Sequence, residues 1–401
     1  MKVLFTLLHA GGLAHLNPLI ALDSLCKRAG IKTAFLVPKF RHSLLKNYGL
    51  DVVSIDHKDA ANNGFRTEMQ AYGKFRPDVV IDDASLTTYF ATKVCNIPRI
   101  AIHRTGIFPG TTPKIKTHNH SMGNFDMNTM PDVRYLGIEQ PESFENLFDA
   151  AAKIVPGVKS VEKLPENIES DDSYFYSGPL IIEDFLADPG ETEISFTSVS
   201  KEKKDIDNFK DFSDLENFFH QQKDRKVIYL TYGTIAVGDA PEVIFEVVKW
   251  LLDNDYAVIS SVPIQNLSDE QNSRYFFSRY FPMHYVCERV DLMVHHCGSG
   301  TYHYPIIHKV PTITIGTECY DREDVAYRLQ ELGASIHLSG PNEDSSFFTT
   351  FKNSISRYFD DGDFKEKQQN VLNDLGQEIK ETQRTFDIKK VINFALNANQ
   401  I

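Results

Sequence analysis

The sequence has few cysteines, a single tryptophan and no long apolar run. Its 401 residues include five cysteines and one tryptophan, Trp250. The cysteines are odd in number and widely spaced, and each lies in an apolar stretch, as reduced core thiols do. We therefore expect a protein of the reducing cytoplasm that does not depend on a disulfide framework.

The N-terminus lacks the pattern of a targeting segment. Residues 1–8 are apolar over about the length of a strand and run directly into His9-Ala10-Gly11-Gly12, with no small-residue cleavage site. No stretch of the chain reaches the roughly 18 apolar residues that a membrane-spanning helix needs. We expect neither a signal peptide nor a membrane span.

Basic residues are outnumbered by acidic ones. Lys and Arg number 42 against 55 Asp and Glu, so the formal net charge is -13 at pH 7. A protein of that sign repels a phosphate backbone, which argues against a binder of nucleic acid polymers. The hydrophobic fraction of 42% excludes disordered and fibrous classes. At roughly 150 residues per domain, the length predicts two or three domains.

Strand-like and helix-like patterns alternate in the first hundred residues and again after residue 225. Short apolar or β-branched runs predict buried strands at 2–8, 32–38, 52–55, 79–81, 99–102, 226–232, 257–260, 292–295, 312–315 and 334–338. Apolar residues at helical spacing predict helices at 18–29, 41–48, 86–94, 241–252, 302–308 and 322–332. Such alternation is typical of parallel sheets with helices on both faces.

The remaining segments are less regular. Residues 104–172 mix Gly, Pro, Asn and His with weak periodicity, which indicates loops and short helices. Residues 183–225 hold 12 acidic and 6 basic side chains, which indicates a solvated linker and then a surface helix near 209–222. A last helix with an apolar face is expected at 387–398. The chain is thus predicted to form two βαβ domains of similar size with a cleft between them.

The strongest motif runs from His295 to Thr301, between a predicted strand and a predicted helix. Its small residues allow a ligand to approach the backbone, and the next helix start presents unpaired N–H groups, as a diphosphate site requires. A tight strand–helix turn without a ligand would use the same residues. A metal site is a further alternative, because His303 and His308 follow closely. However, neighbouring strand residues point to opposite faces, and no paired Cys-x-x-Cys or His-x-x-x-His spacing is present.

Two further motifs follow predicted strands of the first half. In the run from Gly11 to Pro18, Asn17 is expected to cap a helix whose first residue is Pro18, with His15 at the mouth of the cleft. Asp82 and Asp83 follow the strand at 79–81. Either carboxylate could cap a helix, or it could orient the His15 ring and stabilise its protonated form. Spacing alone leaves both interpretations open.

Taken together, these motifs resemble the UDP-glycosyltransferase family of inverting, family 1 glycosyltransferases, which includes bacterial enzymes that glycosylate macrolides and other natural products. The resemblance covers nearly the whole chain. It is carried by His15-x-Asn17-Pro18, by the segments 77–83, 176–179 and 229–234, and by the donor motif at 280–322. It implies the α/β GT-B fold, with two Rossmann-like, doubly wound domains facing a cleft.

The resemblance also implies a division of labour along the chain. Residues 1–200 would bind the acceptor, residues 201–385 would bind the nucleotide-sugar donor, and a helix in 386–401 would pack back toward the N-terminal domain. His15 would be the general base on an acceptor hydroxyl, with Asp83 supporting it. Donor contacts would come from Gly233, Thr234, Tyr280, Met283, His296, Gly298, Ser299, Gly300, Thr301, Tyr304, Asp321 and Arg322. The resemblance implies no metal and no cofactor beyond the UDP- or dTDP-sugar.

Four of these positions depart from the family pattern. Tyr280 stands where Trp usually stacks on the base, and Met283 stands where Gln contacts it. Tyr304 replaces the acidic residue at the ribose, which brings this stretch closer to members that use dTDP-sugars. Arg322 replaces a Gln at the sugar, where it could donate to hydroxyls or pair with a sugar carboxylate. A nucleotide-sugar epimerase and a catalytically silent nucleotide-sugar-binding protein are the alternatives to a transferase acting on a small hydrophobic or aromatic acceptor.

Overall fold

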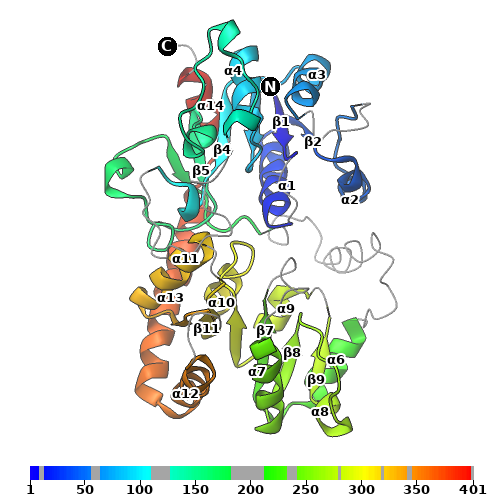
Figure 1. The fold of residues 1–401 in the computed structure, drawn as a ribbon, viewed down its shortest axis with the longest axis vertical. Coiled ribbons are helices and arrows are strands. Elements are labelled where there is room, and N and C mark those ends of the chain that lie inside the picture. The colour runs from blue at the N-terminus through cyan, green and yellow to red at the C-terminus, as the bar shows by residue number, and fades with distance from the viewer. Residues whose placement is uncertain are drawn as a thin grey trace. The chain divides into compact units, whose positions relative to one another are not determined.

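The structure is a computed structural model that describes residues 1–8, 13–55, 64–109, 127–181, 212–232, 242–278, 281–317, 320–340 and 346–398 (Figure 1). These residues form two compact units. Unit 1 contains the described residues up to 181 and those from 379 onward, and unit 2 contains those from 212 to 378. The predicted boundary near residue 200 lies outside the described residues. Each unit is built around its own parallel sheet.

Unit 1 has six parallel strands in the order β2-β1-β3-β4-β5-β6. The strands are β1 (Lys2–Thr6), β2 (Lys32–Leu36), β3 (Val79–Asp82), β4 (Arg99–Ile102), β5 (Ala152–Val155) and β6 (Tyr174–Tyr176). The helices are α1 (Leu13–Arg28), α2 (His42–Asn47), α3 (Gly64–Phe75), α4 (Thr88–Cys95) and α14 (Ile388–Ala398). The strand order reverses between β1 and β3, and ligands of open parallel sheets bind at such a reversal.

Unit 2 also has six parallel strands, in the order β12-β11-β10-β7-β8-β9. They are β7 (Val227–Thr231), β8 (Ala257–Ser260), β9 (Tyr275–Phe277), β10 (Leu292–His295), β11 (Thr312–Ile315) and β12 (Ser335–Leu338). The helices are α6 (Phe212–Gln221), α7 (Glu242–Asp253), α8 (Asp269–Ser273), α9 (Met283–Cys287), α10 (His303–His308), α11 (Tyr320–Leu332), α12 (Phe347–Asp360) and α13 (Gly362–Thr385). This is the Rossmann strand order, and it reverses between β7 and β10.

Apolar helix faces cover both sheets. The face of α7 formed by Ile244, Val247, Val248, Leu251 and Leu252 is fully buried against the sheet of unit 2. Each such side chain contributes about 2 kcal/mol of transfer free energy on burial. The spacing of these residues is the helical period that predicted the element. Among the described residues, no helix is both long and apolar enough to cross a membrane.

The C-terminal helix belongs to unit 1. The division between the units falls inside α13, between residues 378 and 379. Beyond it, Gln383 donates a hydrogen bond to the Pro179 carbonyl at 3.0 Å. Helix α14, red in Figure 1, then contacts α1 and the strands β3, β4 and β5, and Phe394 packs edge-on against Phe175. The last helix therefore completes one face of the N-terminal sheet.

Most predicted strands are confirmed, and the exceptions have local causes. Residues 52–55 make only an isolated bridge, from Val52 to Phe35, because pairing here is limited to the Phe35 backbone, which bonds Asp51 and Val53. The sequence did not predict β5, β6 and β9, which have three or four residues each. Lys153 interrupts the apolar run of β5. Helices α3, α12 and α13 were also missed, and all three carry many polar residues.

The expected start of the first helix is wrong. Helix α1 begins at Leu13, so Pro18 lies inside it and Asn17 is not its N-cap. A proline inside a helix removes the backbone N–H that would bond the carbonyl four residues earlier, here that of Ala14. The Arg104 guanidinium donates to this carbonyl at 3.3 Å. His15 consequently lies in the first turn of α1 rather than in a loop before it.

Candidate active site

His15 and Asp83 meet at the strand reversal of unit 1. His15 follows β1 and Asp83 follows β3, and these strands are neighbours in the sheet. The His15 Nδ1 atom lies 2.9 Å from Asp83 Oδ1. The Asp83 side chain is completely buried, whereas that of His15 is 34% exposed. The contact therefore joins a sealed carboxylate to an imidazole that solutes can reach.

Asp83 is held in its ionised form by an arginine. Arg104 forms two charged hydrogen bonds to it, from Nη1 to Oδ1 at 2.7 Å and from Nη2 to Oδ2 at 2.5 Å. Burial raises the pKa of Asp83, but the charges of Arg104 and His15 outweigh burial and lower it to about 2. An ionised carboxylate only accepts hydrogen bonds, so the proton of this contact sits on His15 Nδ1. The Nε2 atom of the neutral ring then carries the free lone pair.

Asp82 has a different partner. Its carboxylate receives Arg99 Nε at 2.7 Å and Arg99 Nη2 at 2.9 Å, and both side chains are buried. Arg99 Nη1 also donates to the Leu147 carbonyl at 2.6 Å. The pair ties the end of β3 to β4 and to the loop before β5. Helix α4 begins at Thr88, beyond both aspartates, so neither residue is its N-cap.

Sequence reasoning missed Arg104 and a buried glutamate beside this cluster. Glu68 is fully buried and accepts hydrogen bonds from Thr88 and Ser85, and burial raises its pKa to about 8. Nothing in the α3 pattern singled out Glu68. Arg104 did offer a signal, because it follows the predicted strand 99–102 and therefore lies at the same edge of the sheet as Asp83.

The motif after β10 forms a tight turn. The Gly298 carbonyl accepts the N–H groups of Thr301 at 2.8 Å and of Tyr302 at 3.2 Å. Thr301 therefore has its backbone donor engaged inside the turn. The N–H groups of Ser299 and Gly300 have no acceptor among the described residues. Cys297 starts the turn in the left-handed region, with φ of 56°.

His296 lies directly over this turn. A Cβ atom built on Gly298 would stand 2.4 Å from His296 Nε2, so any larger residue there would force the ring to shift. Burial lowers the pKa of His296 well below its usual range, and the charge of Arg322 lowers it further. Burial also lowers the pKa of His295 to about 3. Both imidazoles are therefore neutral, and they offer hydrogen bonds rather than charge.

The structure places the other predicted donor residues in three neighbouring elements. Met283 begins α9 and Tyr304 lies buried in α10. Helices α9 and α10 are joined through His284, whose ring lies 5.0 Å from that of Tyr304 and whose Nδ1 lies 2.7 Å from His308 Nε2. Arg322 lies in the first turn of α11. The predicted site residues that lie outside the described part of the structure are Gly233, Thr234, Tyr280 and the side chain of Asp321.

The histidines and cysteine of the motif do not gather around one point. His295 accepts the Cys297 N–H at 3.0 Å, whereas His308 pairs with His284. Within the described ranges, no group of three or more His, Cys, Asp or Glu side chains could hold a metal ion.

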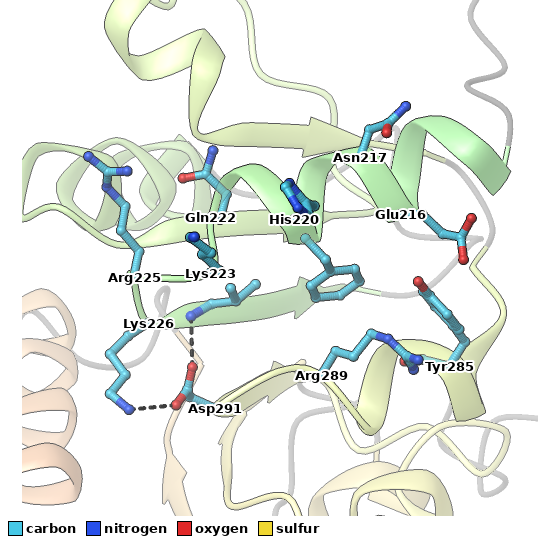
Figure 2. Close-up of a pocket in the computed structure, with 12 residues that line it drawn as sticks. Glu216, Asn217, His220, Gln222, Lys223, Arg225, Lys226, Tyr285, Arg289 and Asp291 are labelled. Atoms are coloured by element: carbon cyan, nitrogen blue, oxygen red, sulfur yellow. Dashed lines mark hydrogen bonds and ion pairs between the residues drawn. The ribbon is translucent and has the colours of Figure 1, made fainter.

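A separate pocket of about 670 Å³ lies beside the start of β7 (Figure 2). It is at the amino end of the strand, opposite the loops that carry the motifs. Its charges are largely paired, with Lys226 2.7 Å from Asp291 and Arg289 stacked on the Tyr285 ring at 3.6 Å. None of the predicted site residues lines it. We therefore assign no part of the candidate active site to this pocket.

Part of the chain matches a known protein family and several curated proteins. Residues 246–383 match the family described as erythromycin biosynthesis protein CIII-like, C-terminal domain. The chain is 27% identical over 150 residues to the 3-alpha-mycarosylerythronolide B desosaminyl transferase of Saccharopolyspora erythraea, covering 36% of this chain and 34% of that protein. It is 26% identical over 114 residues to the 4'-demethylrebeccamycin synthase of Lentzea aerocolonigenes, covering 28% and 27%. The chain thus spans about a third or less of these relatives.

Solved structures resemble the chain over nearly its full length. The glycosyltransferase VinC, solved in complex with dTDP, has a TM-score of 0.64 at 15% identity and covers 98% of this chain and 99% of its own. A UDP-glucose:anthocyanidin 3-O-glucosyltransferase, solved in complex with UDP, has a TM-score of 0.66 at 13% identity and covers 100% and 98%. Likeness at this identity establishes the fold. The chain therefore has the GT-B fold of these glycosyltransferases, and its residues 246–383 match the erythromycin biosynthesis protein CIII-like C-terminal domain.

Proposed function

We propose that the protein is an inverting glycosyltransferase that moves a sugar from a nucleotide diphosphate to a hydroxyl group of a small hydrophobic or aromatic acceptor. The observation that carries the proposal is the contact of 2.9 Å between His15 Nδ1 and Asp83 Oδ1 at the strand reversal of unit 1. An exposed imidazole backed by a buried carboxylate is the arrangement that a general base requires.

The chemistry of the acceptor side follows from this pair. A sugar hydroxyl or a phenol is a weak nucleophile because its proton is firmly held. In the proposed reaction, His15 Nε2 takes this proton while the acceptor oxygen attacks the anomeric carbon from the side opposite the leaving group. The bond to the diphosphate breaks as the new bond forms, so the configuration is inverted. Asp83 holds the tautomer and stabilises the imidazolium that results.

The donor side would stabilise the departing diphosphate. Fixed hydrogen-bond donors aimed at developing negative charge are effective because they need no reorganisation. The Ser299 and Gly300 N–H groups and the neutral His296 ring supply such donors, and Arg322 supplies a positive charge close to His296. In this proposal these groups do the work that a divalent cation does elsewhere, so the reaction needs no metal.

For the donor we propose a class of compound, a UDP- or dTDP-sugar, and not one particular sugar. Tyr304 stands where a carboxylate would hold ribose hydroxyls, and it lies buried in α10. The solved relatives include proteins in complex with dTDP and with UDP. One relative is named a desosaminyl transferase, and this name supports an unusual sugar as the group that is transferred. Arg322 is the residue of this chain that would recognise that sugar.

A transfer assay tests the proposal. The protein is incubated with UDP- and dTDP-sugars and with phenolic and macrolide acceptors, with and without EDTA, and products are followed by mass spectrometry. We expect acceptor-dependent transfer that EDTA leaves intact and that His15→Ala abolishes. Epimerised donor in the absence of acceptor would instead identify an epimerase. Donor binding without turnover would identify a silent binding protein, and either result contradicts the proposal.

A further inference from the structure

Arg104 contacts Asp83 and the backbone carbonyl next to His15. Its two Nη atoms bind the two carboxylate oxygens of Asp83, and Nη2 also donates to the Ala14 carbonyl. Ala14 directly precedes His15 in the first turn of α1. One guanidinium thus joins the residue that supports the proposed base to the backbone that carries it. Because the fork is planar and rigid, it fixes both groups at once.

The Ala14 carbonyl accepts this bond because of Pro18. In an uninterrupted helix, the N–H of residue 18 would bond the carbonyl of residue 14. Pro18 has no N–H, so the carbonyl is left without its helical donor. This part-buried carbonyl instead accepts a hydrogen bond from Arg104. The proline of the His-x-Asn-Pro motif therefore opens a binding point for Arg104 on α1.

The loop that carries Arg104 is itself held in place. The Thr105 N–H donates to Glu162 at 2.7 Å, and the Thr105 hydroxyl donates to the same carboxylate oxygen. Glu162 is buried, and its carbonyl accepts the Tyr176 hydroxyl at 2.7 Å. The guanidinium is therefore presented from a fixed backbone, as a positioning role demands.

We propose that Arg104 is the positioning residue of the base, which orients Asp83 and the first turn of α1 together and offsets the Asp83 charge behind His15. This proposal rests on the proposed function of His15. Among the described residues, Asp83 is the charged partner of the ring and Arg104 is the partner of Asp83, while the adjacent Asp82 is paired with Arg99. Without Arg104, the Asp83 carboxylate would act on the imidazolium unopposed.

The direct test is the titration of His15 followed by NMR in the substrate-free protein, with the resonance assigned through His15→Ala. In Arg104→Met we expect the midpoint to rise by roughly 1 pH unit, because an opposite charge within hydrogen-bond distance stabilises the charged ring. The acid limb of the kcat profile should move the same way, with the donor KM unchanged. The titration needs no turnover, so it tests Arg104 even if no sugar transfer is found.

Arg99→Met is the matched control, because it makes the same change in the neighbouring pair. We expect it to lower the melting temperature and to raise the His15 midpoint less than Arg104→Met does, because Asp82 makes no contact with the ring. If Arg104→Met does not fold, Arg104→Lys replaces it. Lysine keeps the charge and loses the fork, so kcat should fall about tenfold with an unchanged midpoint. A folded Arg104→Met protein with a wild-type midpoint overturns the proposal, as does Arg104→Lys with wild-type kcat.

Pro18→Ala tests the link through α1. The new N–H competes with Arg104 for the Ala14 carbonyl, while the Asp83 pair stays intact. We expect a higher melting temperature, because a helix interior favours alanine, together with a kcat reduced about threefold at saturating donor. A stabilised variant with full kcat would show that the Ala14 contact does not position the base.

Discussion

The turns that follow β3 and β10 lie at the strand reversals of the two units, yet they control charge in opposite ways. At the end of β3, the buried Asp82 and Asp83 are each paired with an arginine. Burial raises the pKa of Asp82, whereas the charges of Arg104 and His15 lower the pKa of Asp83 to about 2. After β10, burial lowers the pKa of both His295 and His296, so the rings are neutral. One turn keeps buried charge by pairing it, and the other avoids buried charge altogether.

This difference fits the two proposed tasks. A base needs a fixed anion behind it throughout the reaction, and only ion pairing maintains an anion away from water. A diphosphate site needs donors that accommodate charge when the ligand brings it, which neutral imidazoles and backbone N–H groups do. Both turns also contain a non-glycine residue in the left-handed region, Ala84 with φ of 54° and Cys297 with φ of 56°. Such strain is commonly found at functional sites.

The largest effect is expected from His15→Ala. Loss of a general base lowers kcat by about 10² to 10⁴-fold. The donor KM should change little, because the donor residues lie in unit 2. His220→Ala, which removes an exposed histidine from α6, is the matched control and should retain full activity. A His15→Ala enzyme with more than a tenth of wild-type kcat would falsify the role of His15.

The next largest effect is expected from Gly298→Ala. The new methyl group would overlap His296 Nε2, so the ring must move away from the turn. We expect the donor KM to rise about tenfold, since a displaced donor group costs roughly 1.4 kcal/mol. Gly362→Ala, where a Cβ meets nothing within 4 Å, serves as the control. Equal donor KM values in the two variants would show that His296 does not contact the diphosphate.

Acid should weaken unit 2 before unit 1. The folded-state pKa of His295 is about 3, and that of His296 is also lowered, so both contribute stability above pH 6.5 that is lost as pH falls toward 3. Each lowers the free energy of unfolding by about 1 kcal/mol per pH unit in that range. In unit 1, the pKa of His103 is also lowered to about 3, so His103 likewise contributes stability that is lost as the pH falls. Glu68, with a pKa raised to about 8, has the opposite sign and gains stability on acidification from pH 8 to 4.5.

Hydrogen exchange measured from pH 7 to pH 5 would separate the two units. We expect protection to fall in β10 and β7 while β1 and β3 keep theirs. In Glu68→Gln, the compensation in unit 1 is removed, so the strands around β3 should then lose protection as well. Parallel loss in both units of the wild-type protein would contradict the assigned protonation states.

The smallest effects concern the two left-handed residues. Ala84→Gly removes the Cβ strain at little packing cost, and we expect it to raise the free energy of unfolding by about 0.5 kcal/mol. Cys297→Gly removes the same strain but also a side chain that is 2% exposed, so we expect a net loss of about 1 kcal/mol. Urea denaturation measures both. Effects of the same sign would show that packing at Cys297 is less important than its backbone strain.

Local patterns predicted much of this molecule because they depend on neighbouring residues. The apolar runs that end at Asp82 and His295 predicted β3 and β10, and strand–helix alternation predicted the parallel sheets. Helices α12 and α13 were not predicted because their many polar residues obscure the helical spacing of the apolar ones. The expected helix start at Pro18 was wrong for a related reason. Proline usually marks the start of a helix. Inside α1 it is tolerated because Arg104, which is far along the chain, bonds the Ala14 carbonyl.

By itself, the sequence determined which chemical groups stand at the carboxyl ends of the strands, since a strand's length and its following turn are set by adjacent residues. The spacing left Asp82 and Asp83 equivalent, although the family resemblance favoured Asp83. Only the tertiary structure showed Asp83 in contact with His15, Arg104 paired with Asp83, and His295 and His296 neutral. The physical reason is that ion pairing and desolvation arise from residues brought together across the fold, and no local pattern encodes these distances.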